Sequence, residues 1–548
     1  MMLSLPRRRL IPKWRSISAT LSKSESTSID RNDVKLFLGD EEGLDKAIAL
    51  WRDSKSPGIL GEVLSFSVHE NLTTKIREIA NEAIKSNAAA TPVQRRFMQD
   101  FSRGLIGDYS SQLLNDSSIS QGYPYQAHVS KLRSLLRAAP ENVFALLDYA
   151  QFQAAAGKII SAERSIITAR ELAPNNRIVL RTAARFYVHA RNPEFAHNLI
   201  KLHSRTPGDP WLMASEISLA NTINVKSHFL SKGKRFILDQ RHMSPAHITE
   251  LAGSIAIEEI NSGSLKLARE HQRKALLAPN DNVIAQAIGQ ADLFGIHLDG
   301  PVVQGALAAS NEALMLRSWI DLEPEMVEIY AQKWHMEEPF SSRPIVMLST
   351  LYANRGDFDK AYQWVRIGLI SDPHDVGLLT NLAYVQARKG NVSESRRAIR
   401  ALKHLNFGLA NAFADANEGL LAYMQGAYEV GDGYYDAALD FLEKKKLPNV
   451  AAYCAINQAL AALDFQRPNV ADVIKKANQY ILSYPSYDSA MLLKLRTASE
   501  IEQVSVPEVR KRRVSQWIYD PNKNTLTERV GLTGSGAQSL VILDRKSN

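Results

Sequence analysis

Residues 531–539 have the glycine spacing of a phosphate-binding loop, reading Gly-Leu-Thr-Gly-Ser-Gly-Ala-Gln-Ser. Such a loop needs a lysine that neutralises the phosphate and a following helix whose N-terminus faces the anion. Ala537 stands where that lysine must be, and the chain ends before a helix could follow. We therefore expect a turn here and no nucleotide site.

Several histidines fall within one short stretch, where a metal site is the chemistry to consider. None has the spacing of a metal-ligand set with a supporting carboxylate or cysteine. His247 and Glu250 could share a helical turn, but such a pair is common. We expect satisfied core or surface histidines and no bound metal. The histidines concerned are His189, His197, His203, His242 and His247.

The carboxylates and the single cysteine form no catalytic pattern either. Glu258 and Glu259 fit a solvated helix face better than a general acid–base pair. Cys454 is the only cysteine, so no intrachain disulfide can form. Alanines on both sides of Cys454 favour a small buried filler over a nucleophile. We expect a non-catalytic protein with no cofactor and no small-molecule substrate.

Two runs of basic residues could contact a polyanion, which would be nucleic acid or an acidic protein surface. Trp14, between Lys13 and Arg15, could add a stacking surface for bases. A solvated tail is the alternative at both ends of the chain. The runs are Arg7, Arg8 and Arg9, and Arg510, Lys511, Arg512 and Arg513.

The formal net charge of +8 is concentrated in these ends. Residues 1–24 carry six Lys/Arg and no acid, and residues 505–548 carry eight Lys/Arg and four acids. The body between them is near neutral, so the charge indicates basic tails and not a body that binds nucleic acid.

Arg181 and Arg185 lie four residues apart, which places them on one face of a helix that contains both. Two guanidinium groups so placed could grip a carboxylate of a bound peptide. They could equally hold a structural carboxylate of the chain itself. Which carboxylate the two arginines can contact depends on the helices that carry them.

Those elements follow a fixed period. Gly356 and Gly390 are 34 residues apart, and so are Ala361 and Ser395. Small residues therefore recur where two helices cross closely, with a turn between them. Helices shorter than about 12–15 residues are marginal in water, so stacking against neighbouring units must stabilise them. The period predicts helix–turn–helix units stacked into a solenoid.

The pattern resembles the tetratricopeptide repeat, whose period is 34 and whose signature has Leu-Gly and Tyr in the first helix, then Ala and Pro. One unit has Leu348-Ser349, Tyr352, Ala361 and Pro373 at these places. Phe407 replaces the closing proline of the next unit. The resemblance implies an all-α, right-handed α-solenoid of stacked helix–turn–helix repeats, to which the sequence adds a short β-rich C-terminal tail.

In this family the first helix of each unit lines a concave groove that binds extended peptides or helices. Arg181 and Arg185 resemble one part of a clamp that some members use for peptide C-termini. Asp148 and Leu113 stand where that clamp has Asn and Lys, so the full clamp is absent. The resemblance implies a scaffold or adaptor with protein or peptide partners in a multi-protein complex. It places Gln151, Arg181, Arg185, Thr350, Tyr384 and Tyr423 in the groove.

Changes in composition and in the clarity of the repeat frame divide the chain into six parts. Helices at 283–294, 301–316 and 324–333 are expected in the fourth part. Strands at 514–520, 525–530 and 539–544 are expected in the last. The parts are a basic flexible segment (1–39), a helical cap or divergent repeats (40–107), tetratricopeptide-like repeats (108–281), an irregular helical segment (282–341), further repeats with a capping helix (342–503), and a basic linker with the β-strand tail (504–548).

No run of about 18 apolar residues occurs, so we expect no membrane span, and the basic start lacks the apolar core of a secretory signal. A cytoplasmic location follows, with the mitochondrial matrix as the alternative because the N-terminus is rich in Arg and Ser and free of acids. Two functions stay open. The first is a non-catalytic interaction scaffold, and the second is a regulatory subunit whose basic termini contact nucleic acid while its repeats bind another protein.

Overall fold

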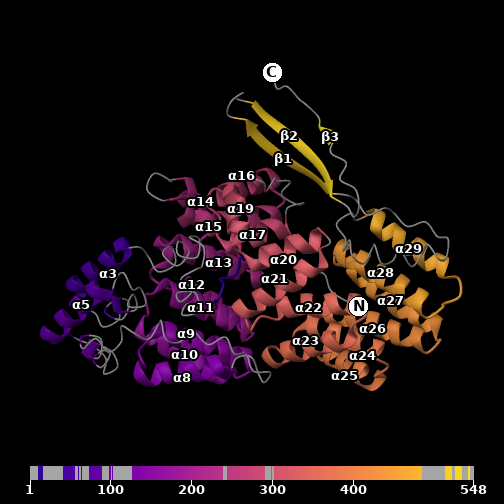
Figure 1. Ribbon diagram of the computed structural model, residues 1–548, viewed down its shortest axis with the longest axis horizontal. Coiled ribbons are helices and arrows are strands. Elements are labelled where there is room, and N and C mark those ends of the chain that lie inside the picture. The colour runs from indigo at the N-terminus through magenta and orange to yellow at the C-terminus, as the bar shows by residue number, and fades with distance from the viewer. Residues whose placement is uncertain are drawn as a thin grey trace.

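A computed structural model gives the structure of the protein, and helices dominate the part of the chain that it describes (Figure 1). Described are residues 10–15, 41–55, 60, 63–64, 73–88, 95, 98–99, 102, 126–238, 244–290, 298, 301–321, 323–405, 408–483, 512–520, 525–533 and 541–542.

Short helices follow one another along the chain and pack mainly on their neighbours in sequence. This is the stacked helical solenoid that the period predicted. The helices are α3 (Glu41–Ser54), α5 (Thr73–Lys85), α8 (Gln126–Ala138), α9 (Val143–Ala155), α10 (Ile159–Leu172), α11 (Arg177–His189), α12 (Pro193–Lys201), the 3-10 turn η3 (Thr206–Gly208), α13 (Pro210–Thr222), α14 (Leu230–Leu238), α15 (Pro245–Asn261), α16 (Leu265–Ala275), α17 (Asp281–Gly289), α19 (Pro301–Ala308), α20 (Asn311–Ile320), α21 (Pro324–Glu337), α22 (Ser342–Asn354), α23 (Phe358–Ser371), α24 (Val376–Arg388), α25 (Val392–His404), α26 (Gly408–Met424), α27 (Tyr428–Lys444), α28 (Pro448–Asp464) and α29 (Val470–Ser483).

The turn between the two helices of a unit uses one residue in the left-handed region. Gly356 and Gly390 both have a φ of +80°, which glycine adopts without steric cost. Arg191 has the same place in its unit, with a φ of 61°. The repeat therefore requires a left-handed backbone conformation at this turn position, which is usually but not always a glycine.

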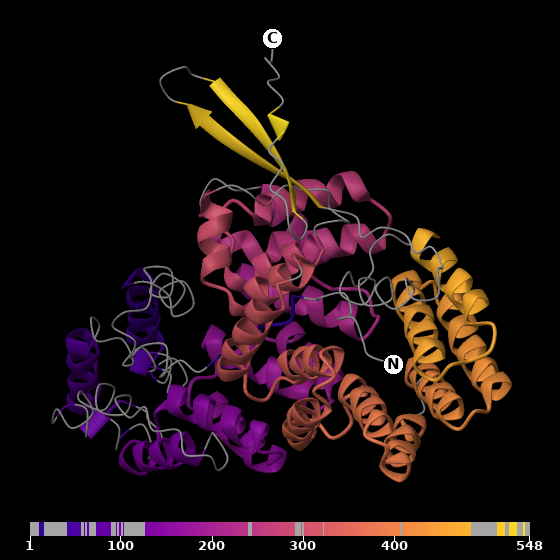
Figure 2. The ribbon, with the colours of Figure 1, turned by 45° about the vertical axis from the view of Figure 1, so that its right-hand side comes forward.

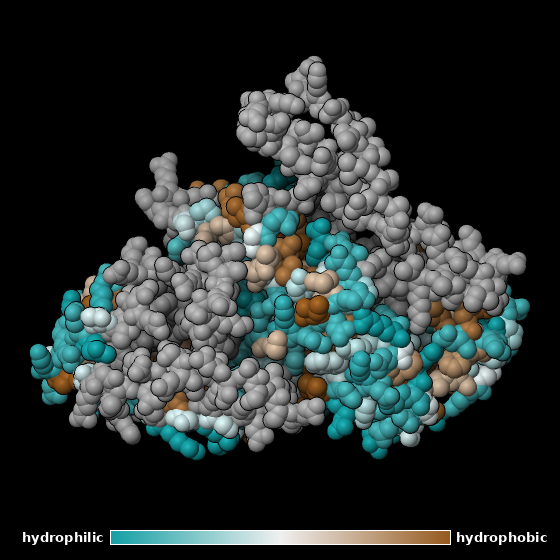
Figure 3. Space-filling model, in the orientation of Figure 1, coloured by the Kyte–Doolittle hydropathy of each residue, from teal (hydrophilic) through white to brown (hydrophobic). Residues whose placement is uncertain are grey.

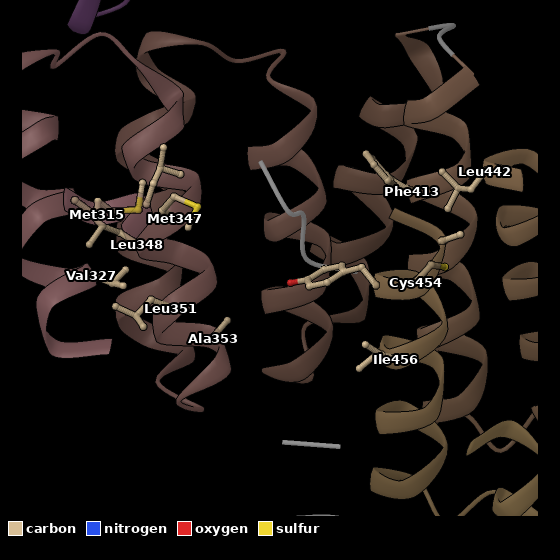
Figure 4. Close-up of a cluster of buried hydrophobic side chains, with 14 of the residues drawn as sticks. Met315, Val327, Met347, Leu348, Leu351, Ala353, Phe413, Leu442, Cys454 and Ile456 are labelled. Carbon is tan, nitrogen blue, oxygen red and sulfur yellow. The ribbon is translucent and has the colours of Figure 1, made fainter. Parts of the chain in front are cut away.

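The small residues of the frame lie where the two helices of a unit cross. Ala162, Ala361 and Ser395 are fully buried there. Ser395 donates a hydrogen bond from its hydroxyl to the carbonyl of Ala383 at 2.8 Å, so its polar atom is satisfied inside the crossing. Side chains from neighbouring units then fill a continuous core, as Met347 and Leu348 on one side and Phe413 and Ile456 on the other illustrate (Figure 4).

Between the two clear halves of the array, α20 and α21 pack as a further helix pair. The single helix predicted at 301–316 is two helices. Ser310 separates them because its hydroxyl caps α20 by accepting a hydrogen bond from the amide of Ala313 at 3.2 Å.

The array curves until distant units meet. Arg191 forms an ion pair with Asp372 at 2.6 Å. A Cβ on Gly157, after α9, would lie 2.4 Å from the carbonyl oxygen of Ile370 in α23, so only glycine fits at this contact. First helices from α9 to α22 therefore surround a common interior (Figure 2).

In addition to the stacked array, the molecule has two smaller parts. Helices α3 and α5 lie at one end of the molecule and share a separate apolar cluster that includes Leu44, Ile48 and Trp51 (Figure 1). Strands β1 (Arg512–Asp520), β2 (Thr525–Thr533) and β3 (Val541–Ile542) form an antiparallel sheet in the order β1-β2-β3. On the face shown in Figure 3, hydrophilic residues predominate around α25, and hydrophobic residues are exposed in smaller patches elsewhere.

Candidate functional site

Residues 10–15, here called the strap, lie in the interior enclosed by the first helices (Figure 2). The sequence is Leu-Ile-Pro-Lys-Trp-Arg, and the backbone is neither helix nor strand. We expected a flexible segment over 1–39. The strap differs from that expectation because its side chains find partners on six different helices and on the loop after α21; the other residues of 1–39 lie outside the described ones.

Trp14 is the centre of the strap, with an exposure of 1%. Its ring lies between Phe186 of α11, with centroids 6.0 Å apart, and Phe340 of the loop after α21, with centroids 4.7 Å apart. The indole N–H donates to the carbonyl of Leu147 in α9 at 3.2 Å. Both the apolar body and the polar tip of the indole are therefore satisfied.

Carboxamide side chains hold the strap backbone. Gln151 of α9 donates to the carbonyl of Trp14, and Asn282 of α17 donates to the carbonyl of Ile11 at 3.3 Å. Leu10 packs on α15 where Gly253 leaves room, since a Cβ there would lie 2.6 Å from the Leu10 Cδ1 atom. Contacts to backbone carbonyls do not depend on the side chains of the bound peptide, whereas the contacts of Leu10 and Trp14 do.

Three carboxylates, here called the acidic cluster, receive the two basic residues of the strap. Lys13 pairs with Asp281 at 2.8 Å and with Glu312 at 3.2 Å. Arg15 pairs with Asp281 at 2.6 Å and with Glu337 at 3.1 Å. The acidic cluster thus takes one residue from each of α17, α20 and α21.

Burial dominates the electrostatics of the acidic cluster. The side chains of Asp281 and Glu312 are 4% and 0% exposed. Burial raises the pKa of Glu337, and the charges of Arg15 and Lys13 act against that rise. Because buried carboxylates are costly unless paired, the strap cations offset much of the desolvation cost of the cluster.

The helices position these groups through ordinary capping and polar contacts. Asn280 caps α17 by accepting from the amide of Val283 at 2.9 Å, and Asp281 opens the helix. Arg343, at the start of α22, pairs at 2.6 Å with the Glu312 carboxylate oxygen that Lys13 does not contact. Glu337 accepts from the Asn311 amide at 2.6 Å.

The two arginines that were predicted to act as a pair, Arg181 and Arg185, have different partners in the structure. Arg181 is 3% exposed, pairs with Glu250 at 2.5 Å and lies over the ring of Trp211. It therefore holds a structural carboxylate, one of the two alternatives that the spacing left open. Arg185 is partly exposed and lies over the ring of Phe340, on which Trp14 also packs.

The other predicted groove residues lie at different depths. Gln151 contacts the strap directly. Thr350 is fully buried and accepts from the Asn381 amide at 3.1 Å, and Tyr384 is partly buried in α24. Tyr423 is 1% exposed and donates to Asp432; burial raises its pKa, and this hydrogen bond adds to the rise.

Only two residues of the predicted basic runs lie within the described part of the chain. Arg7, Arg8, Arg9, Arg510 and Lys511 lie outside the described residues, and Arg512 and Arg513 open β1. Lys13, Trp14 and Arg15 do not form the exposed stacking surface considered for nucleic acid, because the structure encloses them among carboxylates and aromatic rings.

Sequence reasoning missed the residues that define the strap site. Phe186, Asn282, Glu312 and Phe340 carry no local pattern that marks them. The sequence did carry a signal in the bound segment itself, where a tryptophan lies between two basic residues in an acid-free stretch. That signal indicates a segment that binds something, but it does not identify the surface that receives it.

Cys454 is buried in α28, and burial raises the pKa of its thiol to about 12. Within the described residues, no group of three or more His, Cys, Asp or Glu is placed to hold a metal ion. None of the described helices is both long and apolar enough to cross a membrane.

No family model matches the sequence, and no curated protein is similar to it. Among solved structures, the chain is similar to "Crystal structure of APC/C hetero-tetramer Cut9-Hcn1", with 12% identity, 89% of this chain and 93% of that chain covered, and a TM-score of 0.37. Similarity at that level says nothing of what this chain binds. The arrangement of its helix pairs and turns identifies the chain as a helical repeat solenoid.

Proposed function

We propose that this chain is a non-catalytic scaffold or adaptor subunit of the tetratricopeptide-repeat kind. Its first helices bind an extended segment of a partner protein, within a multi-protein assembly in the cytoplasm. One observation carries the proposal: the inner side of the solenoid already holds a peptide segment that is neither helix nor strand, through carboxamide contacts to its carbonyls. Such contacts fit a peptide of any origin, and solenoids commonly use their concave surfaces in this way.

The test is affinity capture with mass spectrometry, using full-length protein and two matched charge reversals. Arg185→Glu changes the inner side, on the first helix α11, where Arg185 lies over Phe340. Arg164→Glu makes the same change on the exposed face of the second helix α10. Circular dichroism establishes that both variants are folded.

We expect Arg164→Glu to retain the proteins captured by the unchanged chain and Arg185→Glu to lose them. Equal capture by both variants would move partner binding away from the inner side. Loss through Arg164→Glu alone would assign it to the outer side.

A further inference from the structure

Resting on the proposed function, we propose that the strap is an internal ligand that closes the site, and that its external ligand is a partner segment of the same chemistry. That segment is extended and carries a basic–aromatic–basic triplet with an apolar residue four positions before the aromatic one. The partner gains the site by displacing residues 10–15.

The contacts of the strap are those of a bound peptide and not of a repeat element. Its hydrogen bonds join it to residues far along the chain: Leu147 is 133 positions after Trp14, and Asn282 is 271 positions after Ile11. In sequence, 25 residues separate Arg15 from Glu41, where α3 begins. The covalent connection keeps residues 10–15 near the site whether or not they occupy it.

Each side chain of the proposed triplet has its own subsite. The aromatic position has the rings of Phe186 and Phe340 and a carbonyl for an indole N–H. Each basic position contacts two carboxylates, and both positions share Asp281. The apolar position is the space over Gly253.

The acidic cluster sets the charge of any occupant. Loss of residues 10–15 would take two cations from the acidic cluster, in which Asp281 and Glu312 are buried and Glu337 is partly buried. Uncompensated buried carboxylates are costly, so an acidic or neutral segment would bind poorly. Nucleic acid is disfavoured here for the same reason, because its phosphates would face the carboxylates.

The strap also determines how tightly a partner segment must bind in order to displace it from the site. Because the strap belongs to the same chain, it competes with an external segment intramolecularly, at an effective concentration that the external segment must overcome. The apparent affinity of a partner equals its intrinsic affinity multiplied by the fraction of molecules whose site is open. Weakening the strap should therefore strengthen binding of an external segment.

The test uses the full chain and a fluorescein-labelled synthetic peptide with the sequence of residues 8–17 as the probe. A release variant, Lys13→Ala/Trp14→Ala/Arg15→Ala, removes the triplet and leaves the array unchanged. The control variant, Arg7→Ala/Arg8→Ala/Arg9→Ala, removes three positive charges, whereas the release variant removes two. It leaves residues 10–15 unchanged. A scrambled peptide and a peptide with Glu at both basic positions of the triplet complete the set.

By fluorescence anisotropy, we expect the release variant to bind the probe at least about tenfold more tightly than the unchanged or control chains. The scrambled and Glu-containing peptides should bind weakly to all three. Equal affinity for the probe in all chains, or no binding in any, would overturn the inference.

A second measurement does not depend on the release variant folding. Hydrogen exchange of the unchanged chain is followed with and without excess probe. The strap amides should lose protection when the probe is present, while the amides of α15 keep theirs. Unchanged protection of the strap would make it a permanent part of the core and refute the exchange.

Two outcomes separate this inference from the function on which it rests. If the unchanged chain captures partners through its inner side while the probe never enters the strap site, the inference fails and the scaffold function stands. If a concentration-dependent dimer forms that the release variant lacks, the external ligand is the strap of a second copy, and the assignment to a partner protein is wrong.

Discussion

Gly431 tests whether the close crossing of α26 and α27 determines stability. A Cβ at this position would lie 2.3 Å from Cδ1 and 2.5 Å from Cε1 of Tyr423, and 3.0 Å from the carbonyl oxygen of Gly419. The tyrosine cannot easily move away, because its hydroxyl donates to Asp432 and its ring packs on that of Tyr435.

Gly433, two residues later in the same helix, is the matched control, because a Cβ there meets nothing within 4 Å. Replacing either glycine with alanine removes the helix penalty of glycine, worth about 1 kcal/mol. Only Gly431→Ala adds overpacking, which costs about 1–3 kcal/mol. We expect Gly433→Ala to stabilise the protein by about 0.5–1 kcal/mol and Gly431→Ala to destabilise it by up to about 2 kcal/mol.

Urea unfolding followed by circular dichroism measures both variants, and hydrogen exchange in α26 and α27 detects a local effect if the array does not unfold in one step. The difference between the two variants cancels the shared helix term and gives the cost of overpacking directly. If both alanines stabilise the protein equally, the helices do not cross as closely as described, and the reasoning about small residues in the frame fails.

Three further predictions concern buried positions. Ala361→Leu should overpack the crossing of α22 and α23 and cost about 1–3 kcal/mol in urea unfolding; an unchanged midpoint would contradict the frame. Arg181→Met should cost about 3–5 kcal/mol, because Glu250 would stay buried without its cation, and the double replacement of both by Met should cost less; a double variant as unstable as the single one would contradict this. Burial lowers the pKa of His335 from 6.5 to about 4, so its stabilising contribution is full above pH 6.5 and is lost as the pH falls towards 4. By pH 5 the loss is about 2 kcal/mol, which His335→Gln should abolish and the exposed-site control His404→Gln should not; equal acid sensitivity of both variants would refute it.

The inner surface shows where sequence reasoning reached its limit. A period of 34 placed Gln151 and Arg185 on first helices, and both contact or border the strap site. The same period placed Arg181 with them, yet a carboxylate 69 residues away holds that side chain inside the protein. Position along a helix fixes the face of a residue but not the partner that meets it.

The sequence by itself determined the helix–turn–helix units, because their determinants are local. A left-handed turn residue and a small residue at the crossing recur at fixed spacing, as with Gly356 and Ala361, and they act within one unit. Arg191 shows that the geometry persists even where the usual glycine is replaced.

Only the tertiary structure placed residues 10–15 among the first helices of the chain's own array. Phe186, Asp281 and Phe340 come together around Trp14 and its neighbours because the array curves back until α9 meets α23. That curvature is the sum of many small rotations between units, and no single repeat encodes it. The pairing of a basic strap with buried carboxylates is therefore a long-range property that local patterns cannot specify.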